Sequence, residues 1–281
     1  PAFYMVNMMQ PYHLTLPVLG GRYGYVRSAK EMASSTAKAL RIVYSTLKQG
    51  GSEGSGAWGT ALGLLDANLK FDDAGLSAHE KQFVERLLAS GQLDTTQSYS
   101  LGRLASGSSA GWSNTMKFIA AGSHYTEVVN RLTAGLSGFN LEMKAGKDFE
   151  KATSRGIDDA VRGTQYDYSD HNTASALGRH GWAGPVTPLM SSFQNYALQT
   201  SELLLRLVRD AAFRAPKGST PEELARISTE RKVALKTLGG IMATTSMLAG
   251  TLGLPMASVI TRLADGILSE DDDPVDSKHA Y

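Results

Sequence analysis

The stretch VRSAKEMASSTAKALRIVYSTLK, residues 26–48, is the clearest sign of the fold of this chain. Apolar side chains recur in it every three or four residues, which is the spacing of one face of an α-helix. They are Val26, Ala29, Ala33, Ala37, Leu40, Tyr44 and Leu47. We therefore predict a long helix that ends in the Gly/Ser-rich loop of residues 49–56, where glycine favours a break.

Two capping boxes predict where other helices begin. In a capping box a hydroxyl and a carboxylate three residues apart bond the amides that a helix start leaves free. Ser77 and Glu80 match this pattern, so a helix is expected from about Ala78. Residues 220–223, Thr-Pro-Glu-Glu, combine the same pattern with proline at the first helical position.

Apolar stripes support these helices and mark others. One helix is expected to open at Ser113, a charged and moderately amphipathic one to lie between Gly135 and Gly163, and a long one to follow Pro188. The stripes consist of Phe83, Val84, Leu87 and Leu88; of Phe118, Ala121, Tyr125, Val128 and Leu132; and of Phe193, Tyr196, Ala197, Leu204, Leu207, Val208 and Ala211.

The chain lacks sustained apolar/polar alternation and hairpin turn signals, which argues against strands. We predict an all-α fold, a multi-helix array of long amphipathic helices with a C-terminal, small-residue-rich helical hairpin. Glycines and prolines interrupt the pattern between Thr164 and Pro188. The predicted domains are an N-terminal helical subdomain (1–163), an irregular connection (164–188) and a C-terminal helical subdomain (189–281) with an acidic tail.

Composition limits the classes of function. Basic and acidic residues number 28 and 27, so no overall field attracts nucleic acid or an anionic membrane. The absence of cysteine excludes disulfides, thiolate catalysis and cysteine-based zinc sites. The chain begins at Pro1 rather than Met, in sequence that already reads as structured, so we expect it to be part of a longer protein.

Motifs with catalytic or binding chemistry fail in their context. Residues 54–59 match G-x-G-x-x-G and residues 107–111 match G-x-S-x-G, but no buried strand precedes either, so both read as loops. The six histidines show no spacing that sets two of them one helical turn apart for a metal. We therefore expect no enzyme in this chain and assign no catalytic, cofactor-binding or metal-binding residue.

Residues 237–261, here called the uncharged segment, contain no charged side chain. Its 25 residues are long enough to span a bilayer, but four Gly, five Thr, two Ser and Pro255 make it only marginally hydrophobic. Small residues four apart would let two helix backbones approach closely. Two readings remain open, a membrane span and a helical hairpin broken at residues 253–255 and buried in protein.

The candidate membrane or helix-packing site takes its residues from this segment. They are Gly239, Gly240, Ala243, Ser246, Met247, Leu248, Ala249, Gly250, Gly253 and Pro255. Residues 202–236 before the segment hold eight basic and five acidic groups, while residues 262–281 hold two and six. A spanning segment would place its basic flank on the cytoplasmic side.

Several stretches together resemble the C-terminal region of the very large internal virion proteins, or ejection proteins, of tailed and especially short-tailed bacteriophages. The stretches are residues 10–25 (QPYHLTLPVLGGRYGY), Tyr166–Ser169, Gly184-Pro185, Phe193–Tyr196, Arg206, residues 231–240 (RKVALKTLGG) and residues 249–255 (AGTLGLP). The resemblance covers most of the chain, and its motifs are loose and carry no chemistry.

The resemblance implies a structural protein that is packed in the virion interior, delivered with the genome, and helps to form a conduit across the host envelope, in the periplasm or inner membrane. Expected partners are further copies of the chain, other core, portal or ejection proteins, and host membrane after ejection, with no small-molecule substrate. The alternative is a soluble scaffold beside the portal that never enters lipid. Non-specific DNA contact through Arg206, Arg209, Arg214 and Lys217 stays open, but such residues are usually only solvated, and we assign no site to them.

Overall fold

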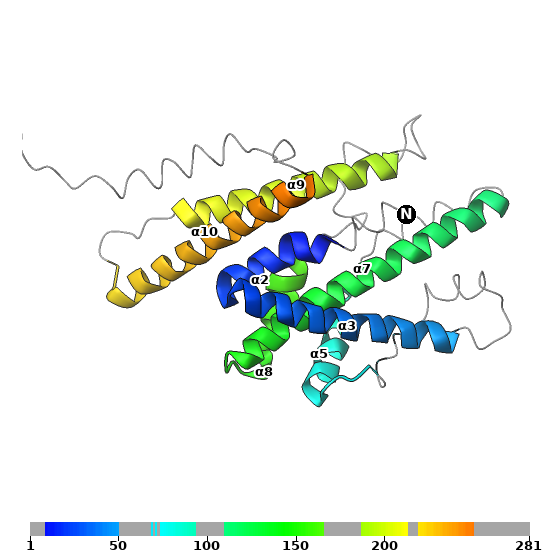
Figure 1. Cartoon of the computed structure of the whole chain (residues 1–281), viewed down its shortest axis with the longest axis horizontal. Coiled ribbons are helices and arrows are strands. Elements are labelled where there is room, and N and C mark those ends of the chain that lie inside the picture. The colour runs from blue at the N-terminus through cyan, green and yellow to red at the C-terminus, as the bar shows by residue number, and fades with distance from the viewer. Residues whose placement is uncertain are drawn as a thin grey trace, which may run out of the picture. The chain divides into compact units, whose positions relative to one another are not determined.

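The computed structural model describes residues 9–50, 69, 71, 74–93, 110–165, 187–212 and 219–249 of the 281-residue chain. These ranges form helices and turns without any strand, so the all-α prediction is confirmed for them (Figure 1). In chain order, with η for a π-helix, the elements are η1 (Pro11–Thr15), α2 (Leu16–Tyr23), α3 (Tyr25–Gly50), α5 (Ala78–Ala89), α7 (Ala110–Lys144), α8 (Phe149–Ser154), η2 (Arg155–Arg162), α9 (Thr187–Ala212) and α10 (Pro221–Ala249).

The chain divides into two compact units, unit 1 (Pro1–Thr200) and unit 2 (Ser201–Tyr281). The division falls within α9. The predicted connection of residues 164–188 is described only at its ends: Thr164 and Gln165 follow η2 in a turn, and Thr187 and Pro188 already belong to α9. The rest of that connection, the acidic tail and the second arm of the predicted hairpin lie outside the described residues.

The core of unit 1 forms where α7 packs against α3, α5, α8 and η2 (Figure 1). Phe83 of α5 stacks on Phe139 of α7 with ring centroids 4.7 Å apart, and Phe149 of α8 meets Phe139 edge-on at 5.6 Å. Both geometries are favourable for aromatic pairs. The stripe predicted for α5 is confirmed, because Phe83, Val84 and Leu87 are fully buried and Leu88 is partly buried.

The two predicted helix starts are confirmed with their capping bonds. Ser77 Oγ accepts from the Glu80 amide at 3.3 Å, and the Glu80 carboxylate accepts from the Ser77 amide at 2.9 Å. At the start of α10, Thr220 Oγ1 accepts from the Glu223 amide at 3.2 Å while Glu223 accepts from the Thr220 amide at 3.0 Å. These local bonds need no tertiary contact, which is why sequence patterns reveal them.

The expected helix break at Gly135 is wrong. Helix α7 begins at Ala110, three residues before Ser113, and runs without interruption through Gly135 and Gly138 to Lys144. Two residues after its end, Gly146 has a φ of 78°, a backbone conformation that favours glycine. The two internal glycines are contact points instead: a Cβ at Gly138 would lie 2.7 Å from the Cβ of Ala160 in η2.

Helix α3 is present as predicted, but its apolar stripe lies on the exposed side. Val26, Leu40 and Tyr44 are 72%, 47% and 66% exposed. The side that faces the core mixes apolar and polar residues: Ser28, Glu31, Met32, Ser35, Ala39, Ile42, Val43 and Thr46. An apolar stripe normally marks the buried face of a helix, so this arrangement leaves an uncovered apolar surface on unit 1.

A small buried polar cluster joins η1 to the turn that follows η2. Thr15 Oγ1 lies 2.6 Å from Thr164 Oγ1 and accepts from Gln165 Nε2 at 3.0 Å. Thr164 also donates to the carbonyl of Ala160. Residues about 150 positions apart in the sequence are therefore linked inside unit 1, with their polar atoms satisfied there.

Candidate functional site

The residues predicted as a membrane or helix-packing site occupy the end of α10 and the chain beyond it. Gly239, Gly240, Ala243, Ser246 and Met247 lie within the described part of the helix. Leu248 and Ala249 are its last two residues, and their side chains are not described. Gly250, Gly253 and Pro255 lie outside the described residues, as does the predicted hairpin break.

One side of this part of α10 is buried and the opposite side is exposed. Ala234, Thr237, Leu238 and Ile241 are buried, at the spacing of one helical face. Every fourth residue on the other side, Leu235, Gly239, Ala243 and Met247, is exposed, and Met247 is 85% exposed. We call these four residues the α10 row.

The α10 row has room for a neighbour. A Cβ built on Gly239 would meet no atom within 4 Å. The predicted close approach of another helix at Gly239 and Ala243 is therefore not made by the described part of this chain. The row offers a surface of apolar and small side chains on which a second helix could come near the backbone.

The hydroxyl groups near the row are satisfied within the helix itself. Thr244 Oγ1 donates to the carbonyls of Gly240 and Ile241 at 3.0 and 3.1 Å, and Thr245 Oγ1 donates to Ile241 at 2.7 Å. A threonine bonded in this way can leave water at lower cost than one without a partner. Moving residues 237–249 into an apolar environment therefore costs less free energy than the number of their hydroxyl groups suggests.

Among the helices that the structure describes, none is both long enough and apolar enough to span a membrane.

Unit 2 holds its two helices together by a bond that the sequence did not suggest. Arg231 of α10 donates from Nε to the carbonyl of Ala211, near the end of α9, at 2.7 Å. The last carbonyls of a helix lack partners within the helix, so a cation there is favourable. Two of the basic residues considered for DNA contact are paired on α9, Arg206 with Glu202 and Arg209 with Asp210, each at 3.2 Å; Arg214 and Lys217 lie outside the described residues.

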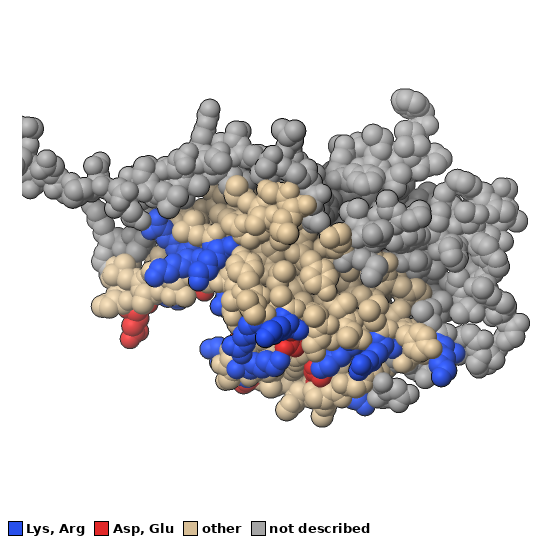
Figure 2. All heavy atoms as spheres, in the orientation of Figure 1, with Lys and Arg blue, Asp and Glu red and all other residues tan. Residues whose placement is uncertain are grey.

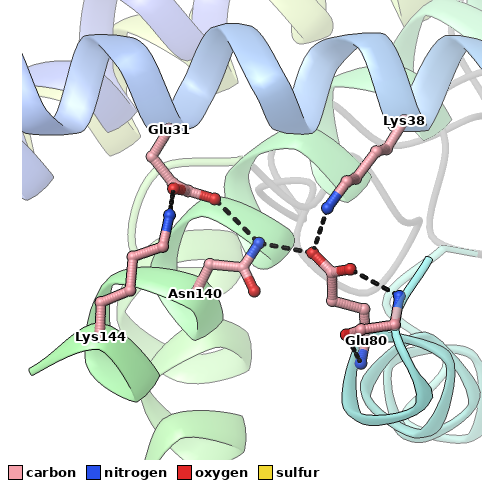
Figure 3. Close-up of polar contacts among 6 residues, drawn as sticks. Glu31, Lys38, Glu80, Asn140 and Lys144 are labelled. Atoms are coloured by element: carbon pink, nitrogen blue, oxygen red, sulfur yellow. Dashed lines mark hydrogen bonds and ion pairs between the residues drawn. The ribbon is translucent and has the colours of Figure 1, made fainter. Parts of the chain in front are cut away.

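A polar network that the sequence reading missed links α3, α5 and α7 in unit 1 (Figure 3). Asn140 Nδ2 donates to Glu31 at 2.9 Å and to Glu80 at 2.7 Å. Lys38 pairs with Glu80 at 2.6 Å, and Lys144 pairs with Glu31. Both carboxylates are almost fully buried, where a polar group without partners is costly, so these partners stabilise them there.

The pKa of Glu80 reflects this network. Burial acts to raise it, but hydrogen bonds from Lys38, the Ser77 amide and Asn140 outweigh burial, and the pKa lies below its usual value. The carboxylate is thus held ionised by donors from three helices. Its surroundings suit a joint between helices better than a proton-transferring group, which needs a pKa near the working pH.

A further buried carboxylate, that of Glu142 in α7, accepts a hydrogen bond from the Tyr23 hydroxyl and lies 4.0 Å from Arg155 Nε. Burial and the Glu142 carboxylate together raise the pKa of Tyr23 above its usual value. Tyr23 therefore stays a hydrogen-bond donor and ties the end of α2 to α7. No local pattern marks this pair, because its members are 119 residues apart in the sequence.

Within the described ranges, no group of three or more His, Asp or Glu side chains is placed to hold a metal ion. The G-x-G-x-x-G match at residues 54–59 and most of the G-x-S-x-G match at residues 107–111 lie outside those ranges. Comparison of the chain with protein-family models, with curated proteins and with solved structures finds no match.

Proposed function

We propose that this chain is a structural, non-enzymatic component of a bacteriophage genome-ejection apparatus. It is packed inside the virion with further copies and with other core or portal proteins, is delivered with the genome, and helps to form a conduit across the host cell envelope. The resemblance of residues 10–25, 231–240 and 249–255 to internal virion proteins supports this role. An all-helical fold is compatible with it.

The observation that carries the proposal is the α10 row. Leu235, Gly239, Ala243 and Met247 form an exposed apolar strip that leads into the rest of the uncharged segment. An exposed apolar strip of this kind favours burial against a neighbouring protein or lipid surface. Close packing on small residues serves inside a protein assembly and in lipid alike, which a component that moves from a particle to an envelope requires.

Vesicle flotation of the full chain tests the membrane step. The chain is mixed with liposomes of phosphatidylethanolamine and phosphatidylglycerol, and the bound fraction is measured. We expect binding that the double substitution Met247→Asp and Leu248→Asp abolishes, because each charge in the bilayer centre costs about 3 kcal/mol. Leu224→Asp is the matched control, since Leu224 is an exposed apolar residue of α10 outside the uncharged segment. Equal binding of the double variant and the wild-type chain would contradict the membrane role.

The second candidate function is a soluble helical scaffold beside the portal. It is favoured by the buried side of the same helix, where Thr237, Leu238 and Ile241 are covered by protein. This role predicts ring-shaped oligomers in plain buffer, visible by electron microscopy, that form without lipid and do not float with vesicles. Flotation that depends on Met247 and Leu248 would exclude the scaffold as the sole function.

A further inference from the structure

An exposed row on α3, made of Lys30 and five residues of the apolar stripe, has the spacing of a coiled-coil seam. Its positions follow one another by four, three, four, three and four residues, which is the 3.5-residue period of a heptad repeat. They are Val26, Lys30, Ala33, Ala37, Leu40 and Tyr44, here called the α3 seam, and all six are exposed. Three heptads of this kind are typical of a helix that pairs with another helix along its length.

The side chains at the centre of the α3 seam are small. Ala33 and Ala37 lie between the larger exposed side chains Val26, Leu40 and Tyr44. A partner helix could approach closely at the two alanines and pack its own larger side chains there. A membrane surface offers no such fit, because binding to it depends on a broad face of bulky apolar residues.

One flank of the seam is cationic. Arg27, Arg41 and Lys48 follow one another at intervals of seven or fourteen residues, which places them in one row beside the seam, and all three are exposed. The acidic residue of α3, Glu31, is buried on the opposite side. Residues 9–50 contain six Lys or Arg and one Glu. Figure 2 shows more Lys and Arg than Asp and Glu on the face of the described residues that it presents.

These charges argue against a second copy of α3 as the occupant. In an antiparallel pair the cationic rows of the two helices would lie against each other, which is unfavourable. A parallel pair would place Lys30 opposite its own copy. Such a pair would also need the other flank, where Thr36 is already hydrogen-bonded to Tyr12 of η1 at 3.1 Å.

We propose that the α3 seam is a docking site for an acidic amphipathic helix of a partner protein. The partner's apolar side chains pack over Ala33 and Ala37 between Val26 and Tyr44, and its carboxylates pair with Arg27, Arg41 and Lys48. The core-facing side of α3 keeps its contacts with α7. This site does not depend on the function proposed above, because it rests on α3 alone.

A binding experiment with the full chain tests the site. The probe is a fluorescent peptide of three heptads with Leu at positions a and d and Glu at positions e and g, and the control peptide has Lys in place of each Glu. We expect saturable binding of the acidic peptide, measured by anisotropy, and no binding of the basic one. The affinity should fall as NaCl rises, because the ion pairs are exposed.

Variants locate the binding to the seam. Leu40→Gln and Arg41→Glu should each lower the affinity for the acidic peptide by about tenfold or more, and tenfold corresponds to about 1.4 kcal/mol. Both residues are exposed, so neither change disturbs the core. Leu224→Gln and Lys232→Glu on α10 are the matched controls and should leave the affinity unchanged, because both residues are exposed and lie outside the α10 row.

Three results of the peptide experiment would overturn the proposal: equal binding of both peptides, no binding of either peptide, or an affinity that Leu40→Gln and Arg41→Glu leave unchanged. A fourth would be that Leu40→Gln weakens self-association or vesicle binding but does not weaken peptide binding. Sedimentation of the chain alone and flotation with phosphatidylglycerol vesicles provide the last of these measurements.

Discussion

Lys38 of α3 and Glu80 of α5 form an ion pair of 2.6 Å across 42 residues of sequence. The lysine is 22% exposed and the carboxylate 6% exposed, so the pair lies at the edge of the core rather than on the surface. Three helices meet at this carboxylate, because Asn140 of α7 donates to the same oxygen. The stability of unit 1 therefore depends on it.

Replacing this carboxylate should destabilise unit 1. Glu80→Gln keeps the shape of the side chain but leaves Lys38 without its counter-charge, and we expect the free energy of unfolding to fall by about 1–3 kcal/mol. Urea denaturation followed by circular dichroism measures the change. Glu150→Gln is the control, because Glu150 pairs with Arg86 where both side chains are largely exposed, and it should cost less than about 1 kcal/mol. A loss in the control as large as in Glu80→Gln would contradict this account.

The same residue predicts a dependence of stability on pH. The pKa of Glu80 is lower in the folded chain than its usual value of 4.5, so the folded state favours the ionised form. Its contribution is present above the unfolded pKa and is lost as the pH falls through the folded pKa. The unfolding free energy of the wild-type chain should decline in acid below about pH 4.5, and Glu80→Gln should show a shallower decline. Parallel curves for the two proteins would refute the assignment.

Two glycine-to-alanine substitutions should act in opposite directions. Alanine is a better helix former than glycine by about 1 kcal/mol. At Gly138 the added methyl would lie 2.7 Å from the Cβ of Ala160, and we expect a net loss of about 1–3 kcal/mol because neither backbone can yield easily. At Gly239 the methyl meets open space, so Gly239→Ala should stabilise α10. Thermal unfolding of each variant measures both signs, and stabilisation by Gly138→Ala would show that α7 and η2 do not pack this closely.

Removal of the Arg231 side chain should weaken unit 2. Arg231→Ala leaves the carbonyl of Ala211 without this donor, and we expect a loss of about 1 kcal/mol. Arg226→Ala is the matched control, since Arg226 lies exposed on the same helix. Amide hydrogen exchange of residues 201–212 is the sharper readout, because faster exchange in Arg231→Ala alone would locate the effect at the end of α9. Equal protection in both variants would count against the bond.

Local sequence patterns predicted where the helices lie in the chain better than they predicted the contacts between helices. The capping boxes at Ser77 and Thr220 were visible because both partners lie three residues apart. Gly135 misled the prediction of α7, because the preference of glycine for breaks is weak and its contact with Phe83 is tertiary.

The polar network that links α3, α5 and α7 could not be predicted from local sequence patterns, and neither could the side of α3 that faces the core. Glu31 meets Asn140 and Lys144 only in the folded chain, across 109 and 113 residues. In the sequence it looks like a solvated residue on the polar side of an amphipathic helix. The candidate site on α10 was predicted as a stretch, but its division into a buried side and the exposed α10 row needed the structure.

The contacts of Thr15 with Thr164 and Gln165 have a mechanical consequence. Because they join η1 to the turn that follows η2, a force that pulls these two segments apart acts directly on this small cluster.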